Sequence, residues 1–340
     1  MRELPPEYTG PALMDLQLNG YAGFDFNGDP ASWTREKLHH VRSALGRRGV
    51  MAALPTLITS EAKAMLARAG RYAELVSGDL ELESCFPRLH IEGPFISPHD
   101  GPRGAHPKRY CRLPRELPDF VQRLVEASGD RIGIVTLAPE LPGAIELIRE
   151  CVDAHIGDTH ICVAIGHTRA TATQLDTAVA AGTRMATHLG NGADALLGPA
   201  DNYIQTQLAD DRLWASFIAD GHHMPMTTLK NFIRAKTPHR AVLVTDAIAA
   251  ADMGPGQYEV GGEIVEADAD GRVAKPGASN LAGSALTLDQ AVINVCKHCN
   301  VPFEQAWAMA STNPATLLGM PALPTITVAV SEKGFRRTDG

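Results

Sequence analysis

The chain has 340 residues, of which 44% are hydrophobic and 21% are charged. This composition is typical of a globular protein and excludes the collagen-like, low-complexity and intrinsically disordered classes. Lys and Arg total 31 against 39 Asp and Glu, so the formal net charge is −8, which argues against non-specific binding to nucleic acid or to an anionic membrane. The first residues lack an apolar signal core, and no apolar run approaches the ~20 residues that a membrane span requires. Six dispersed cysteines do not suggest a disulfide framework, so we expect a soluble cytoplasmic protein.

Short apolar runs recur along the chain, and each ends abruptly in a polar residue or a glycine. Their nearly continuous apolar character, rather than strict alternation, is typical of parallel strands that are covered on both faces. The predicted strands are residues 12–16, 50–54, 88–91, 132–137, 161–165, 184–187, 213–218 and 241–245.

Stretches with helical spacing of apolar residues lie between most of these runs. They cover residues 38–45, 62–69, 120–127, 144–154, 172–181 and 226–235, with two more at 286–296 and 303–310, while 202–209 is compatible with a short helix. Eight strands that alternate with helices predict a parallel α/β fold, and eight is the number that closes a TIM-type (β/α)₈ barrel. A doubly wound open sheet is the alternative, but the sequence has neither a GxGxxG nor a Walker A pattern.

The glycine-rich segment between Gly254 and Gly283 interrupts this alternation. Its alternating residues around Tyr258 and Ile264 predict a hairpin, and long ordered loops of this kind often act as functional lids. We therefore predict one barrel over residues 11–320, with a lid hairpin over 252–284 and a C-terminal tail over 321–340.

Polar side chains follow most of the predicted strands, at the end of a barrel where catalytic groups gather. One carboxylate, several imidazoles and a further aspartate are the residues needed to hold a divalent metal with an open coordination position and to move protons beside it. Any one histidine in such a position is more often structural, but the whole set at one end of a barrel favours a divalent-metal site with a proton-transfer group beside it. These residues are Gln17, Asn19, Glu92, His167, His188, Asp220, His222, His223 and Asp246.

Nine segments, taken in order, resemble the N-acetylglucosamine-6-phosphate deacetylases of the amidohydrolase superfamily. They are DLQLNG (15–20), HIEGPFIS (90–97) with GAHP (104–107), LAPE (137–140), GHT (166–168), THLGN (187–191), IADGHH (218–223), LVTDA (243–247), LAGS (281–284) and NPA (313–315). The resemblance extends from about Pro11 to Gly319. It implies a metal-dependent (β/α)₈ barrel that hydrolyses the acetamide of N-acetylglucosamine 6-phosphate, giving glucosamine 6-phosphate and acetate.

The resemblance also implies roles for single residues. Glu92, His167 and His188 match the metal ligands, and Asp246 matches the general base and acid that works with metal-bound hydroxide. The positions that match substrate contacts are Ala105, His106, Asn191, Gly192, His223, Leu281, Ala282 and Gly283.

Gln17 and Asn19 stand where many superfamily members have an HxH pair that helps to bind two metals. Amide side chains bind transition metals poorly, so we expect one divalent ion, with Gln17 or Asn19 contacting its water. Zn²⁺ is the expected ion, and Fe²⁺, Co²⁺ and Mn²⁺ are the alternatives. The other partners implied are a small N-acetyl amino sugar phosphate and a second copy of the chain in a homodimer, with no nucleic acid and no membrane.

The chain departs from the family pattern in the segment after His188. An arginine that reaches the phosphate is usual there, whereas residues 191–201 contain no arginine and two acids, Asp194 and Asp201. Lys108, Arg109 and Arg212 are the candidate substitutes. A deacylase of another, unphosphorylated N-acyl amino sugar or related amide is therefore an alternative, and a non-catalytic sugar-binding barrel is a third.

The ends of the chain also depart from the family pattern. Family members carry a small flanking β-sandwich, for which this chain has only about ten residues before its first barrel strand. We expect the tail to supply one strand at most, so that the sandwich is absent or vestigial.

Overall fold

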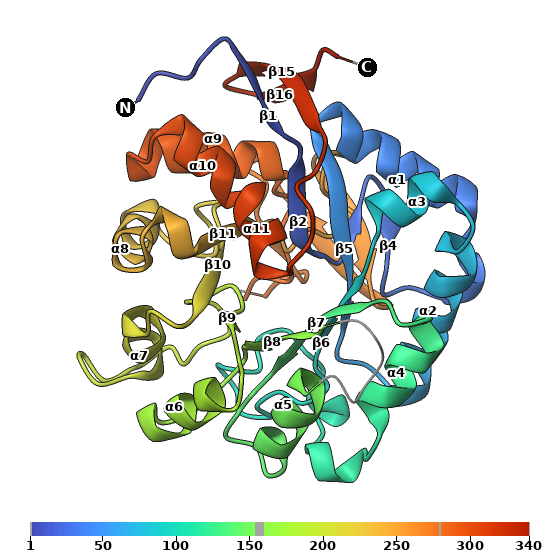
Figure 1. Ribbon diagram of the computed structural model, residues 1–340, viewed down its shortest axis with the longest axis vertical. Helices are drawn as coiled ribbons and strands as arrows, with labels where there is room; N and C mark the ends of the chain where they lie inside the picture. The colour runs from blue at the N-terminus through green and yellow to red at the C-terminus, as the bar shows by residue number, and fades with distance from the viewer. Residues whose placement is uncertain (1, 154–159, 279, 340) are drawn as a thin grey trace.

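The computed structural model describes residues 2–153, 160–278 and 280–339. Its centre is an eight-stranded parallel sheet in the order β2-β5-β6-β7-β8-β9-β10-β11, so strands that follow one another in the chain are neighbours in space (Figure 1). The strands are β2 (Leu13–Leu18), β5 (Val50–Ile58), β6 (Leu89–Glu92), β7 (Ile132–Leu137), β8 (Cys162–Ile165), β9 (Met185–Ala186), β10 (Trp214–Ile218) and β11 (Ala241–Val244). All eight predicted strands are present.

The sheet closes into a barrel between its first and last strands. Leu18 and Ala247 form a parallel bridge, and the backbone N–H of Asp246 donates to the carbonyl of Gln17 at 3.0 Å. Below this bridge the hydroxyl of Thr245 donates to the buried carboxyl of Asp15 at 2.5 Å. The (β/α)₈ prediction is thereby confirmed.

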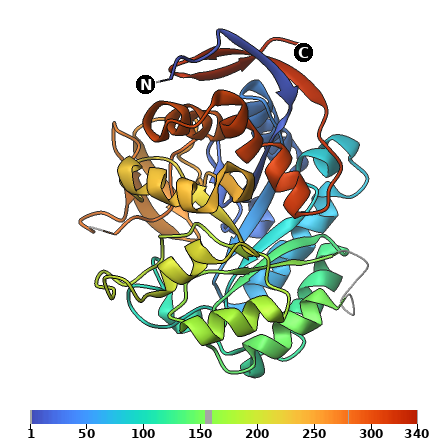
Figure 2. The ribbon, with the colours of Figure 1, turned by 60° about the vertical axis from the view of Figure 1, so that its left-hand side comes forward.

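Helices surround the strands, as Figures 1 and 2 show. Their apolar faces pack onto the sheet, and several start at side-chain caps, such as Thr34 before the first helix and the Thr171–Gln174 capping box. The helices are α1 (Arg35–Arg47), α2 (Ala62–Val76), α3 (Leu80–Cys85), α4 (Phe120–Ser128), α5 (Ala144–Val152), α6 (Ala172–Ala180), α7 (Tyr203–Ala209), α8 (Met226–Lys236), α9 (Leu288–Cys299), α10 (Phe303–Met309) and α11 (Thr312–Leu317), with 3₁₀ turns at Pro30–Ser32, Lys108–Tyr110, Pro114–Glu116 and Pro238–Arg240. None of the helices in the described part of the chain is long and apolar enough to cross a membrane.

The two ends of the chain meet in a small antiparallel sheet beside the barrel (Figure 2). It joins β1 (Glu7–Pro11), β15 (Thr325–Ser331) and β16 (Gly334–Arg337) in that order. The prediction of at most one strand from the tail was wrong, because Glu332 and Lys333 turn the chain back into a second strand. Phe335 of this strand is buried against Trp307, with ring centroids 5.4 Å apart, and this contact fixes the sheet to α10.

The glycine-rich segment after β11 forms a second small sheet of β12 (Gly256–Val260), β13 (Glu263–Ala267) and β14 (Val273–Ala274). The N–H of Gly261 at the hairpin turn donates to Asp25 at 2.8 Å, next to the short pair β3 (Gly20–Tyr21) and β4 (Phe24–Asp25). The β13–β14 turn reaches the loop after β10, where the ring of His222 contacts the Asp270 carbonyl at 2.9 Å. The hairpin sheet therefore spans two loops that follow the C-terminal ends of barrel strands.

Asp15 at the barrel closure makes stability depend on pH. Burial raises the pKa of Asp15 to about 7 from its ordinary 3.8, although hydrogen bonds from Thr245 and Gln17 oppose the shift. The unfolded chain loses this proton at lower pH than the folded chain. The contribution of Asp15 to the free energy of unfolding is therefore greatest below pH 4 and falls as the pH rises to 7. An asparagine can keep the bonds with Thr245 without a charge. We expect the stability advantage of Asp15→Asn to grow by about 2–3 kcal/mol between pH 5 and pH 8, measured by urea unfolding of both proteins; a constant difference would contradict the shift.

Candidate metal centre and active site

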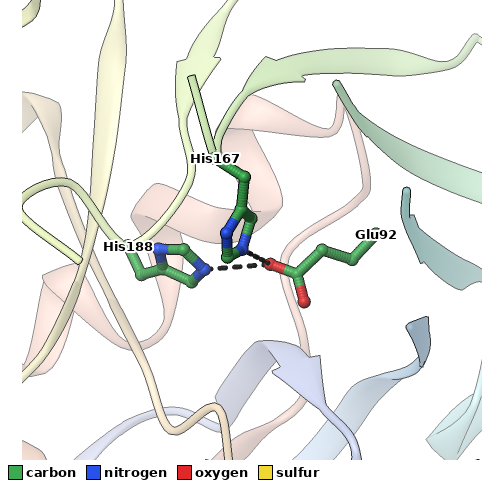
Figure 3. A group of neighbouring side chains, drawn as sticks. All are labelled: Glu92, His167 and His188. Carbon is green, nitrogen blue, oxygen red and sulfur yellow. Dashed lines mark hydrogen bonds and ion pairs between the residues drawn. The ribbon is translucent and has the colours of Figure 1, made fainter. Parts of the chain in front are cut away.

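Three barrel strands bring Glu92, His167 and His188 together at their C-terminal ends (Figure 3). Glu92 ends β6, whereas His167 and His188 each stand two residues beyond their strands, β8 and β9. Oε1 of Glu92 lies 3.2 Å from Nε2 of His167 and 2.9 Å from Nε2 of His188. The three side chains are buried, and their donor atoms lie within 4.8 Å of one another.

Backbone geometry turns both histidines inward. His167 and His188 adopt positive φ values of 52° and 30°. Such values are uncommon for residues other than glycine, and backbone strain of this kind is often found at functional sites. Nδ1 of His167 donates to the carbonyl of Pro102 at 2.8 Å, and the N–H of His188 donates to Oγ of Ser216 at 2.7 Å. The Pro102 bond leaves Nε2 of His167 as the nitrogen that faces Glu92.

Two glycines beside the metal ligands stand where a side chain would clash with neighbouring atoms. A Cβ on Gly93, directly after Glu92, would lie 2.0 Å from Oγ1 of Thr59, and Gly93 has a φ of 92°. A Cβ on Gly192 would lie 2.6 Å from Nδ1 of His167. The HIEGP and LGNG segments therefore need glycine because the backbone approaches its neighbours closely at these positions.

A buried histidine underlies this group. His90 of β6 contacts the Leu16 carbonyl through Nδ1 at 3.0 Å and Oγ1 of Thr136 through Nε2 at 2.8 Å, and Thr136 contacts Thr187 at 2.8 Å. Burial lowers the pKa of His90 to about 4, so its ring is neutral at pH 7. The chain of contacts ties β2, β6, β7 and the residue before His188 together beneath the site.

The charges of the ligand group suit a divalent cation. Burial by itself would raise the pKa of Glu92, but hydrogen bonds from His167 and His188 and their charge hold it well below its ordinary value. Burial opposes charge on His188 as well, yet the bond with Glu92 raises its pKa. Two imidazoles and one carboxylate at strand ends are a ligand set typical of catalytic divalent-metal sites, so these residues fit a metal ion.

Asp246 lies beside the metal ligands at the end of β11. Its φ is 51°, and its Oδ1 accepts hydrogen bonds from Nδ2 of Asn19 at 2.6 Å and from Nε2 of Gln17 at 3.1 Å. The same Gln17 nitrogen lies 3.0 Å from Oε1 of Glu92. Burial raises the pKa of Asp246, and the negative charge of Glu92 adds to the rise, while His188 and His223 oppose it. Gln17 and Asn19 thus hold one oxygen of Asp246; contact of either residue with a metal-bound water stays a prediction.

The structure places the remaining predicted residues around this group, at different distances from it. The His106 ring is buried with its centroid 4.4 Å from that of His167, and burial, followed by the charge of His167, lowers the pKa of His106 to about 3. Nδ2 of Asn191 donates to the His188 carbonyl at 3.1 Å, and Gly192 lies against the His167 ring. Ala105 is exposed.

The segment Leu281–Gly283 lies beside the backbone of Asp246. Leu281 pairs with Ala274, and the N–H of Ala282 donates to the Val273 carbonyl at 3.2 Å. Directly after the segment, the N–H of Ser284 donates to the Asp246 carbonyl at 3.1 Å. The lid sheet is thereby connected to the residue predicted to move protons.

The contacts that orient the site residues are not predicted from the sequence. Asp220 is among the polar residues expected at the strand ends, but its pairing with His223 is not predicted: its carboxylate lies 2.7 Å from Nδ1 of His223. The Asp-Gly-His-His order, which is typical of an aspartate-capped turn, is the signal that could have found it. The Pro102 carbonyl and the Ser216 hydroxyl left no such signal, since both act through three-dimensional proximity.

The segment 191–201 has two acids where the family usually has an arginine, and one of them, Asp194, is paired with a cation. Asp194 receives a two-pronged ion pair from Arg169 and a hydrogen bond from Tyr203 at 3.1 Å. Arg212, one of the proposed substitutes, precedes β10 and pairs with Asp210 and Asp176, so it lies at the opposite end of the barrel and is excluded. Lys108 and Arg109 lie in the long loop after β6, which also carries His106.

Comparison with known proteins agrees with this geometry. A model of the amidohydrolase family matches residues 11–328. N-acetylgalactosamine-6-phosphate deacetylase of Escherichia coli O157:H7 is 32% identical over 94% of this chain and 80% of its own length, and N-acetylglucosamine-6-phosphate deacetylase of Homo sapiens is 34% identical over 94% and 76%. The solved N-acetyl-D-glucosamine-6-phosphate deacetylase of Mycobacterium smegmatis superimposes with a TM-score of 0.85 at 26% identity, over 99% of this chain and 86% of that one. A mutant of that enzyme in complex with N-acetyl-D-glucosamine-6-phosphate gives 0.83. With its family match covering most of the barrel, this chain belongs to the amidohydrolase family.

Proposed function

We propose that the protein hydrolyses the acetamide of N-acetylglucosamine 6-phosphate, giving glucosamine 6-phosphate and acetate. The observation that carries the proposal is the convergence of Glu92, His167 and His188 beside Asp246. Support comes from relatives with this activity that are 31–34% identical over more than nine tenths of the chain. Because another relative of similar identity is an N-acetylgalactosamine-6-phosphate deacetylase, the two sugar epimers are both candidates.

A single Zn²⁺ ion held by Glu92, His167 and His188 is the cofactor that we propose. When bound, such an ion supplies Lewis acidity that polarises the acetamide carbonyl and activates a water molecule. The residue chemistry supports this choice, because nitrogen donors and one carboxylate are common zinc ligands. The amide pair of Gln17 and Asn19 disfavours a second ion, since both amide NH₂ groups are already bonded to Asp246.

Asp246 moves the protons in this mechanism. Its Oδ1 is held by two amide donors, so the other oxygen, Oδ2, is left to accept a proton from the attacking water. The water oxygen forms a bond to the acetamide carbon, and the carbon–nitrogen bond then breaks as Asp246 returns the proton to the amine. A carboxyl whose pKa is raised by burial is better suited to return a proton near neutral pH than an ordinary aspartate.

We assign to His106 the role of stabilising the developing oxyanion. Its ring is neutral at pH 7 because burial lowers its pKa to about 3, so it can donate a single N–H. Its ring packs edge-to-face on the ring of His167, and its Nε2 lies 3.8 Å from Oε2 of Glu92. A fixed donor of this kind stabilises negative charge without reorganisation during the reaction.

A second candidate is a deacetylase of unphosphorylated N-acetylhexosamines. It is favoured by the segment 191–201, in which no arginine is present. The neighbouring Arg169, whose side chain is 43% exposed, already pairs with Asp194. Against it, that same pair cancels the charge of Asp194, so repulsion of a phosphate is smaller than the sequence suggests.

The substrate is tested by acetate release from phosphorylated and free sugars. With zinc-loaded protein, we expect kcat/KM for N-acetylglucosamine 6-phosphate to exceed that for N-acetylglucosamine by at least about 100-fold, since charge-assisted contacts to phosphate contribute several kcal/mol. N-acetylgalactosamine 6-phosphate is the matched epimer control. Equal kcat/KM for the phosphorylated and free sugars would reject the first proposal in favour of the second.

A further inference from the structure

The loop after β10 contains a carboxylate–imidazole pair next to the candidate active site. Oδ2 of Asp220 lies 2.7 Å from Nδ1 of His223, and both side chains are shielded, with exposed fractions of 7% and 9%. Oδ1 of Asp220 accepts the backbone N–H groups of His222 and His223, each at 2.9 Å. One carboxylate thus fixes both the fold of this turn and the orientation of one ring.

The bond to Asp220 determines which nitrogen of His223 is free. A carboxylate can only accept, so Nδ1 of His223 carries a proton and Nε2 is the nitrogen left for other contacts. His223 lies close enough to Asp246 that a charge on its ring would lower the pKa of that carboxyl. Asp220 from its own loop and Asp246 from the end of β11 both interact electrostatically with His223.

The contacts of Asp220 favour its ionised, carboxylate form. Burial would raise its pKa, but the hydrogen bond and charge of His223 and the two backbone donors lower it overall. His222, whose backbone N–H also donates to Asp220, extends the same turn toward the hairpin sheet. The ring of His222 donates there to the Asp270 carbonyl at 2.9 Å. The two adjacent histidines therefore point to different neighbours from one turn that Asp220 organises.

We propose that Asp220 is a positioning residue for the reaction: it keeps the proton of His223 on Nδ1, so that Nε2 alone is presented to a polar oxygen of the substrate beside Asp246. This inference rests on the proposed deacetylase function for its catalytic consequence, but the tautomer of His223 can be measured without substrate. The arrangement is the same as that by which outer carboxylates orient histidines in other enzymes.

Asp220→Asn separates positioning from folding. The asparagine oxygen can still accept the N–H groups of His222 and His223, whereas its NH₂ group faces Nδ1 of His223 and can only donate. The neutral ring is then forced to carry its proton on Nε2. We expect ¹⁵N NMR of the zinc-loaded protein to show His223 changing from the Nδ1–H to the Nε2–H form, with an unchanged melting temperature; an unchanged tautomer would overturn the proposal.

A double-mutant cycle with His223→Ala tests the consequence for turnover. We expect Asp220→Asn to lower kcat/KM by about 10–100-fold with metal content unchanged, and the double variant to be no slower than His223→Ala within about twofold. Asp176→Asn, at an exposed ion pair far from the site, is the matched control and should retain full activity. Losses that multiply in the double variant would show that Asp220 acts independently of His223 and would overturn the proposal. If no N-acetylhexosamine is turned over by the wild type, the proposed function fails, and the NMR result still decides the position of the proton.

Discussion

Asp246→Asn is expected to lower kcat by about 10³–10⁴-fold, because a general acid and base contributes up to that amount. An asparagine at this position keeps an oxygen for the bond from Asn19, which is 2.6 Å long in the wild type, so the architecture should persist. What it loses is the ability to take a proton from water and return it to the amine. Acetate release is the measurement for turnover, and elemental analysis is the measurement for metal content.

Metal content should be unchanged in this variant, since Asp246 is not one of the three grouped ligands. Asp176→Asn serves again as the control, because it removes a carboxylate that is 70% exposed and leaves the site intact. An Asp246→Asn enzyme that kept more than a tenth of the wild-type kcat would remove Asp246 from the mechanism.

His188→Ala is expected to abolish tight metal binding, with activity falling below detection when the protein is purified without added metal. Loss of an outer partner of a metal ligand commonly costs 10–100-fold in affinity, so loss of a ligand itself should weaken binding by more than about 100-fold. It also leaves the buried Glu92 without its 2.9 Å partner, which should lower the melting temperature.

The exposed His40 on α1 provides the matched control, because His40→Ala removes an imidazole far from the strand ends. Zinc titration by calorimetry compares the three proteins directly. Wild-type zinc affinity in His188→Ala would contradict the ligand assignment.

The barrel could be predicted because its physics is local and repetitive. A parallel strand covered on both faces must be apolar throughout, and β7 and β8 are fully buried along their length. The polar residues that follow such runs lie at one end of the barrel by topology alone. That is why the sequence alone predicts that Glu92, His167, His188 and Asp246 lie together.

The tail could not be predicted as well, because its signal is weak. β16 contains a single large apolar residue, Phe335, whose burial depends on Trp307 almost thirty residues earlier in the chain. The polar residues around Phe335 lie on a sheet that is exposed on one face, so their sequence does not differ from that of a loop. The resulting sheet has three strands, which agrees with the expectation that the flanking β-sandwich is vestigial.

Fine geometry of the site was also beyond the sequence. His167, His188 and Asp246 have positive φ values, and nothing in the local sequence distinguishes these residues from histidines and aspartates in ordinary loops. The pairing of Asp194 with Arg169 depends on two segments that are 25 residues apart. The sequence therefore suggests that Asp194 is an unpaired negative charge, whereas in the structure Arg169 pairs with it.

Metal-dependent deacetylation is tested most directly by following one reaction with metal-free and zinc-restored protein. With N-acetylglucosamine 6-phosphate as substrate, we expect the chelated protein to be inactive and one equivalent of Zn²⁺ per chain to restore turnover, with acetate and glucosamine 6-phosphate released in equal amounts. Full activity of the metal-free protein, or no acetate from the zinc-restored protein, would contradict it.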